Sequence, residues 1–225
     1  RAHETLALSP DGEWFALSGE AGAVLLCHAR SKQLVAAFKM NRPGASLAFG
    51  PGGRLFSGSQ GGEVYVWDVR ASRCAARFAD EGLSATTALA ASADGKWLAI
   101  GSASGVVNVY QAPALVNTEA PRAVPAKALL NLATQVTTLE FNHSSEVLAL
   151  ASRSKKSALR LVHLPSLSVY PNWPTVKTPL RYPQCVAFSA KSEYIAMGND
   201  RGNALLYRMH HFADAAAAEE GAAAV

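Results

Sequence analysis

Short apolar runs alternate with polar turns along this chain, and the same order of runs and turns recurs. Each copy has an apolar run, a polar turn, a second apolar run, a glycine-bearing turn and a third apolar run. The runs are rich in Val, Leu and aromatic residues, which favours strands over helices. Five copies align, at residues 6–40, 46–80, 88–113, 138–173 and 185–212. The sequence therefore predicts an all-β protein built from tandem repeats.

Polar and glycine turns mark the hairpins within each repeat. Asp11-Gly12 and Asp94-Gly95 are the clearest turns between first and second strands. Glycine suits the following hairpin turn because such turns need a positive φ. The glycines in question are Gly22, Gly62, Gly105 and Gly202. We expect second strands at 14–17, 97–100 and 194–197, and third strands at 24–27, 64–67, 106–110 and 204–207.

The repeat length indicates the architecture. Pro10, Pro51 and Ala93 recur at intervals of 41 and 42 residues, close to the period of four-stranded propeller blades. We therefore predict a WD40-type β-propeller with about five four-stranded blades out of an expected ring of seven. The expected blades cover about 5–44, 45–84, 85–115, 129–175 and 183–212, followed by an Ala-rich tail at 213–225.

The repeats depart from the usual WD pattern. Trp67-Asp68 is the only intact WD dipeptide, so the polar network that the Asp supports is expected to be mostly absent. The last repeat stops after its third strand. We expect the remaining blades to precede Arg1 and an outer strand from the other end of the chain to cover the last edge. The large groups Trp14, Trp67, Trp97 and Tyr207 are expected to pack between blades.

Composition narrows the class of protein. Apolar residues make up 49% of the chain and charged residues 17%, which allows a packed core and excludes a disordered chain. No apolar run approaches the roughly 20 residues of a membrane span, so no membrane partner is expected. Cys27, Cys74 and Cys185 cannot form a complete disulfide set, and no secretory leader opens the chain. An intracellular, reducing compartment is favoured.

The motifs that would carry catalysis are missing from the sequence. Cys27 and His28 are adjacent on a predicted strand and point to opposite faces, which a single metal ion cannot easily use. The glycines near 50–53 and 58–62 are not followed by a helix, so they lack the helix N-terminus of a phosphate-binding loop. We predict no enzyme activity, no catalytic or metal-ligating residue, no cofactor and no small-molecule substrate.

Charge is distributed unevenly along the chain. The net charge is +4; residues 1–112 carry ten basic and nine acidic side chains, whereas residues 121–210 carry eleven and four. Part of this excess lies in loops expected to project from the blades, and loops are where recognition usually occurs. We predict contacts to protein or RNA at Arg153, Lys155, Lys156, Lys177, Arg181, His210 and His211. The other interpretation is a solvated basic face without a partner.

Several specific motifs lie in the second half. Residues 160–166 read RLVHLPS, and residues 198–211 read GNDRGNALLYRMHH. Together with 129–132, 136–142 and Trp173-Pro174, they make the chain resemble the U3 small nucleolar RNA-associated protein 18 family. The resemblance spans nearly the whole chain. It is sharpest from about Ala128 to Phe212 and only WD-like before Ala85.

This resemblance implies a function. It points to a non-catalytic scaffold subunit of the UTP-B subcomplex in the small-subunit processome, the U3 small nucleolar ribonucleoprotein of the nucleolus. Such a subunit supports pre-18S rRNA processing and assembly of the 40S ribosomal subunit. The implied partners are other UTP-B subunits, which are WD-repeat and helical-repeat proteins, with U3 RNA and pre-rRNA in the same assembly. The family's N-terminal extension is not in this chain, and none of its activities is carried over.

Two other functions compete with this one. A WD40 substrate receptor, or another docking module unrelated to ribosome assembly, would need exposed Arg and aromatic residues around one mouth of the channel. A propeller hydrolase or lyase would need His, carboxylate or metal ligands that converge there. The six His residues show no such placement in matching positions of the repeats.

Overall fold

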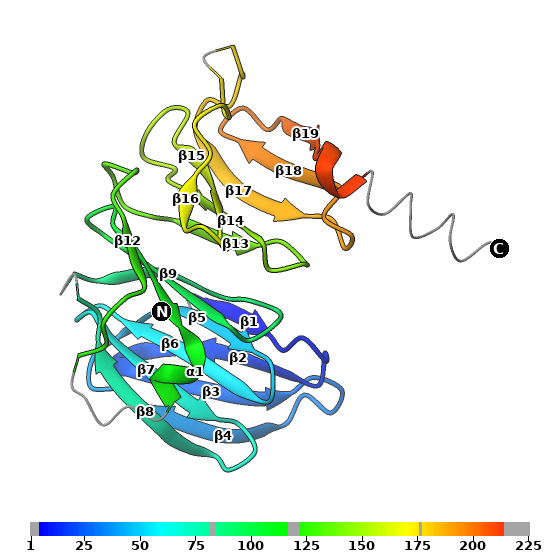
Figure 1. Ribbon diagram of the computed structural model, residues 1–225. Coiled ribbons are helices and arrows are strands. Elements are labelled where there is room, and N and C mark those ends of the chain that lie inside the picture. Colours follow the sequence, from blue (N-terminus) through cyan, green and yellow to red (C-terminus); the bar gives the residue numbers. More distant parts are fainter. Residues whose placement is uncertain (1–4, 82–83, 117–121, 176, 214–225) are drawn as a thin grey trace. The chain divides into compact units, whose positions relative to one another are not determined.

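The computed structural model describes residues 5–81, 84–116, 122–175 and 177–213 (Figure 1). The chain divides into two compact units, Arg1–Val136 and Thr137–Val225, here called unit 1 and unit 2. Each unit is built of antiparallel sheets whose strands follow one another in chain order. Most neighbouring strands are therefore joined by hairpins, as the alternation of apolar runs and turns predicted; β11 and β12 are the exception, joined through α1 and a longer connection.

The described part of unit 1 contains three four-stranded sheets. The first comprises β1 (Leu6–Leu8), β2 (Trp14–Ser18), β3 (Ala23–His28) and β4 (Leu34–Lys39), with the 3₁₀ turn η1 (Glu20–Gly22) between β2 and β3. The second comprises β5 (Gly44–Gly50), β6 (Arg54–Ser59), β7 (Glu63–Asp68) and β8 (Arg73–Ala79). The third comprises β9 (Thr86–Ala91), β10 (Trp97–Ser102), β11 (Val107–Gln111) and β12 (Lys127–Leu129), with helix α1 (Ala112–Val116) after β11.

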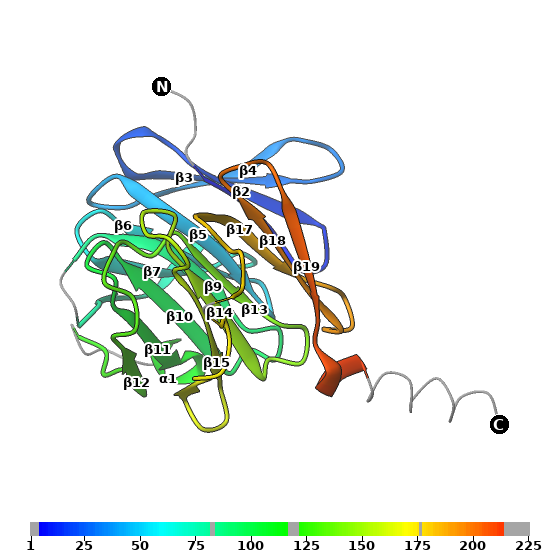
Figure 2. The ribbon, with the colours of Figure 1, turned by 90° about the horizontal axis from the view of Figure 1, so that it is seen from above.

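Unit 2 has one complete sheet and one shorter sheet among its described residues. The complete sheet comprises β13 (Thr138–Phe141), β14 (Val147–Ala151), β15 (Leu159–His163) and β16 (Ser168–Val169). The shorter sheet comprises β17 (Pro183–Phe188), β18 (Tyr194–Asn199) and β19 (Ala204–Arg208). Figure 2 shows β19 at the edge of this sheet. Leu206, within β19, is 65% exposed. The last sheet thus ends after its third strand, as predicted.

The sheets within each unit are arranged as propeller blades. First strands of successive sheets lie side by side: β1 beside β5, and β5 beside β9, in unit 1, and β13 beside β17 in unit 2. In each sheet the strands lie side by side in chain order from the first to the last. The predicted WD40-type β-propeller is confirmed, because five consecutive repeats form five such sheets in the part of the chain described.

One blade extends beyond its predicted limits. We expected the third blade to end near residue 115, but β12 pairs with β11 and places the buried Leu129 opposite Val107. The outer strand comes late because α1 and a long connection separate it from β11. Three residues carry too short an apolar pattern to be recognised. The expected fourth blade, from about 129, therefore takes in only Leu129, the last residue of β12, and the Ala-rich tail lies outside the described residues except for Ala213.

The turn glycines have the predicted backbone geometry. Gly22, Gly62, Gly105 and Gly202 all have positive φ, between 77° and 93°. Gly105 is further constrained, because a Cβ atom there would lie 2.6 Å from the carbonyl oxygen of Leu132. The lack of a side chain thus permits both the turn and the close approach of the following connection.

The core of unit 1 lies between its blades. Trp67 is 4% exposed and stacks on Phe38 and Tyr65, with ring centroids 4.8 Å and 5.4 Å away. Its Nε1–H donates to Ser57 Oγ at 2.7 Å, and Ser57 Oγ donates to the sulfur of Met40 at 3.1 Å. The intact WD repeat thus retains a hydrogen bond from its Trp. The predicted packing role of this residue is confirmed.

The other large groups differ in their surroundings. Trp14 and Tyr207 are half-buried and pack against the core clusters of their own units. Trp97 is also half-buried and lines a groove at the surface of unit 1. The predicted packing between blades is supported for Trp14 and Tyr207, whereas for Trp97 it stays a prediction.

Candidate interaction surface

Two turns of unit 2 are joined to the segment that precedes β17. The backbone N–H of Ser157, in the β14–β15 turn, donates to the carbonyl oxygen of Arg181 at 2.6 Å. The N–H of Asp200, in the β18–β19 turn, donates to the carbonyl oxygen of Tyr182 at 3.1 Å. Both turns lie at the same end of their sheets, because each joins the second strand to the third. They form one continuous edge with the segment between them.

Basic side chains gather on this edge. Arg153, Lys155 and Lys156 are exposed on the β14–β15 turn, and Arg201 is exposed on the β18–β19 turn. Arg181 is half-buried between these turns. We call this set the basic rim: Arg153, Lys155, Lys156, Arg181 and Arg201. The structure thus brings together four of the seven predicted contact residues: Arg153, Lys155, Lys156 and Arg181. It also adds Arg201, which could have been predicted because it lies next to Gly202 in the turn.

Arg181 is partly engaged by a carboxylate. Its Nε lies 3.3 Å from Oδ1 of Asp200, and the N–H of Tyr182 also donates to this oxygen at 3.4 Å. Partial burial acts against ionisation of Asp200, but the hydrogen bonds from Arg181 and Tyr182 outweigh it and lower the pKa of the carboxyl group. Asp200 therefore remains ionised and orients Arg181. The three cations of the β14–β15 turn are the more accessible part of the rim.

Lys177 lies on a separate turn of the 170–182 connection. The N–H of Thr178 donates to the carbonyl oxygen of Thr175, and the N–H of Thr175 donates to Oγ1 of Thr178, both at 3.0 Å. This turn leaves the Lys177 side chain exposed. Its prediction as a contact residue stays a prediction.

His210 and His211 lie with aromatic residues rather than with the basic rim. They follow β19 and line a groove of about 270 Å³ together with Tyr170, Asn172 and Trp173. Trp173 makes an edge contact with Tyr207 at a centroid distance of 5.5 Å, which fixes one wall. Val147, at the end of β14 opposite the β14–β15 turn, lines the same groove. The predicted contact residues therefore belong to different places on unit 2.

The part of the chain that the structure describes offers neither a metal site nor a membrane-spanning helix. Within the described ranges, no three His, Cys, Asp or Glu side chains gather in a way that could hold a metal ion. The helices of the described part of the chain are all too short or too polar to cross a membrane. Cys27 is buried, whereas Cys74 and Cys185 are exposed, and all three are free thiols.

Comparison with known proteins identifies the repeat and the relatives. The model of the WD domain, G-beta repeat, matches residues 45–68, which cover β6, β7 and all but the first residue of β5. A chain in the crystal structure of the mitotic checkpoint complex superposes with a TM-score of 0.75 at 18% identity. That match covers 91% of this chain and 62% of the other, and it shows the fold alone.

Sequence relatives extend over nearly the whole chain. The U3 small nucleolar RNA-associated protein 18 homologs of mouse and human are 44% and 41% identical, each over 92% of this chain. The Arabidopsis thaliana homolog is 38% identical over 94%. This chain spans only 37–38% of the length of these three relatives. The resemblance that the second-half motifs indicated is confirmed: this chain has a WD40-type propeller fold and is similar over nearly its whole length to U3 small nucleolar RNA-associated protein 18 homologs.

Proposed function

We propose that this chain acts in ribosome biogenesis, as a non-catalytic scaffold subunit of the nucleolar small-subunit processome. The observation that carries the proposal is homology over more than nine-tenths of the chain to relatives named for association with the U3 small nucleolar RNA. The matched chain itself folds as WD40-type propeller blades. Its proposed role is to present binding surfaces to other components, in support of pre-18S rRNA processing and 40S subunit assembly.

The structure offers a physical basis for such a scaffold. Apolar clusters between the blades hold the sheets of each unit together, while the turns leave charged groups in solvent. A packed core resists deformation, so the turns are presented at fixed spacing. Other UTP-B subunits, which are WD-repeat and helical-repeat proteins, would dock on such surfaces. The basic rim is suited to phosphates of U3 RNA or pre-rRNA, because Lys and Arg bind phosphate through charge and hydrogen bonds.

Affinity purification of the full-length protein from cells tests the scaffold role. We expect ribosome-assembly factors and U3 RNA to be recovered together with it, since a subunit of a large assembly remains bound through several surfaces at once. Recovery with a ubiquitin ligase, and without U3 RNA, would instead support a substrate receptor and contradict the proposal.

Reversal of the accessible rim charges tests RNA contact. In the full-length protein carrying Arg153→Glu, Lys155→Glu and Lys156→Glu, we expect crosslinks in cells to U3 RNA and pre-rRNA to fall. For purified protein and single-stranded RNA, the plot of log affinity against log salt concentration has a negative slope. We expect the magnitude of this slope to fall by about 2, because each lost phosphate contact contributes roughly 0.7.

The matched control reverses three exposed charges elsewhere: Arg30→Glu, Lys32→Glu and Arg73→Glu in unit 1. It changes the net charge by the same amount, so it reports the effect of charge alone. Equal losses of crosslinking and equal changes of slope in the two triple variants would show that the rim has no specific part in RNA contact.

A further inference from the structure

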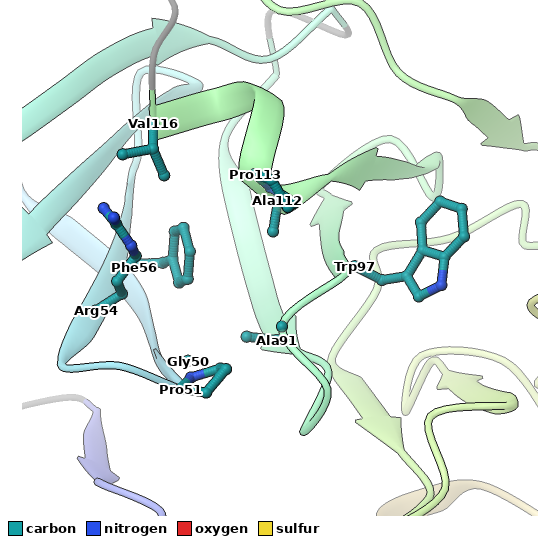
Figure 3. A pocket seen from close by; sticks show the side chains of 10 residues that line it. Gly50, Pro51, Arg54, Phe56, Ala91, Trp97, Ala112, Pro113 and Val116 are labelled. Atoms are coloured by element: carbon teal, nitrogen blue, oxygen red, sulfur yellow. The ribbon is translucent and has the colours of Figure 1, made fainter.

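A second groove lies in unit 1, and nothing in the sequence pattern indicated it. It has a volume of about 270 Å³ and opens between the second and third blades. The β5–β6 hairpin contributes Pro51, Arg54 and Phe56, and helix α1 contributes Ala112 and Val116. Figure 3 shows the Phe56 ring and the Arg54 side chain facing α1, whereas the indole of Trp97 points away from this space. The walls that surround the groove are thus mainly apolar.

Arg54 is the charged group of this groove. It is half-buried, and it is the one ionisable side chain among the ten described residues that line the space. Its guanidinium makes no hydrogen bond or ion pair with any residue that the structure describes. Asp68, the residue opposite it on β7, uses Oδ1 to accept the N–H of Ala71. A partly desolvated cation without a counter-ion gains free energy when a carboxylate binds to it.

Close packing fixes the walls of the groove. Phe56 is 2% exposed and Ala112 is 7% exposed, so both belong to the core as well as to the groove. The two adjacent hairpin turns approach closely: a Cβ atom on Gly95 would lie 2.8 Å from Cγ of Pro51. A preformed groove loses little conformational freedom when a ligand binds.

The size of the groove limits its occupant. Pockets for cofactors and drug-sized ligands measure about 300–1,000 Å³, and this groove is smaller. It has room for one or two side chains of a protein partner, with the apolar part against Phe56, Ala112 and Val116. The guanidinium of Arg54 at the margin favours a carboxylate and disfavours a cation.

We propose that this groove binds a segment of a partner protein in which a large apolar side chain stands next to an acidic residue. The apolar side chain fills the space between Phe56 and α1, and the neighbouring carboxylate pairs with Arg54. This surface is separate from the basic rim. The inference concerns a protein partner and does not depend on RNA binding.

Saturation-transfer NMR on the full-length protein tests this proposal with two peptides, GSELESG and GSKLKSG. We expect saturation of the leucine methyl groups with GSELESG and a signal about tenfold weaker with GSKLKSG, because Arg54 attracts one peptide and repels the other. In the Arg54→Glu variant this preference for GSELESG over GSKLKSG should invert. Arg54→Lys should keep the sign of the preference.

Two further variants separate the groove from general electrostatics. Arg70→Glu changes an exposed charge that lies against Gly53 and does not line the groove, so it should leave the preference in place. Ala91→Ile places a strand-compatible side chain into the groove and should abolish the signal of both peptides. Equal signals for the two peptides, or a preference that survives Arg54→Glu, would overturn the proposal. Displacement of GSELESG by oligouridine would also overturn it, since the site would then bind nucleic acid.

Discussion

Replacement of Trp67 by Ala is expected to lower the free energy of unfolding by about 3–5 kcal/mol, the usual cost of removing a buried Trp or Phe side chain. The indole stacks on both Phe38 and Tyr65, and its N–H is bonded to the buried Ser57. Truncation would leave a cavity between the first two blades and the Ser57 hydroxyl without this donor. Urea titration followed by far-UV circular dichroism measures the change as a lower midpoint at unchanged slope.

Two variants divide this effect into packing and hydrogen bonding. Trp67→Phe keeps a ring in the stack but removes the donor, so it should cost less than Trp67→Ala. Trp97→Ala removes an indole that is half-buried and points away from its groove. We expect it to cost at least about 1 kcal/mol less than Trp67→Ala, because less apolar area is lost from the interior. Equal losses for the two Ala variants would show that Trp67 has no special place in the core.

Replacement of Asp80 by Ala is expected to destabilise the protein by about 2–4 kcal/mol, because it leaves buried donors without an acceptor. Asp80 is 1% exposed and lies between the second and third blades. Oδ1 accepts the hydroxyl of Tyr110 at 2.6 Å and the side-chain amide of Asn108 at 3.0 Å. Burial, with the hydrogen bond and charge of Asp80, raises the pKa of Tyr110, so the phenol remains a donor at physiological pH.

A double-mutant cycle with Tyr110→Phe isolates the Asp80–Tyr110 hydrogen bond. Once the hydroxyl is gone, Asp80→Ala should cost less than it does in the parent protein, by an interaction energy of about 1–3 kcal/mol. Asp68→Ala serves as the control for loss of a carboxylate, since Asp68 is only half-buried and accepts a single backbone N–H. Strict additivity of the two single changes would refute the idea that Asp80 and Tyr110 act as a pair.

The strands were predictable because their signals are local. Val64–Trp67 and Trp97–Ile100 stand out as short apolar runs between turn residues, and both lie within strands of the structure. The turn glycines could be assigned because only glycine readily adopts positive φ. β12 escaped prediction because three residues carry no periodicity, and the partner that defines this strand, β11, lies before a long connection.

The candidate sites were predictable only in part. Arg153, Lys155 and Lys156 are consecutive or nearly so, and their turn could be read from the repeat. Arg201 joins them because backbone hydrogen bonds connect turns about 45 residues apart. Arg54 gave no signal as a site residue, since a single Arg at the start of a strand is common. Its significance follows from α1 and from the neighbouring hairpin, which leave it half-buried without a counter-ion in the described structure.

The order of residues along the chain was enough to establish the all-β class, the number of repeats, the positions of most strands and the family resemblance. Each of these depends on residues that are neighbours along the chain, such as an apolar alternation, a turn glycine or a short motif. Folding in three dimensions establishes which buried groups make contact, for example the hydrogen bond between Asp80 and Tyr110, thirty residues apart. It also decided which charges share an edge and which one borders a groove. Those relationships arise from packing between blades, where the contacting residues are distant in sequence and their pairing leaves no local pattern.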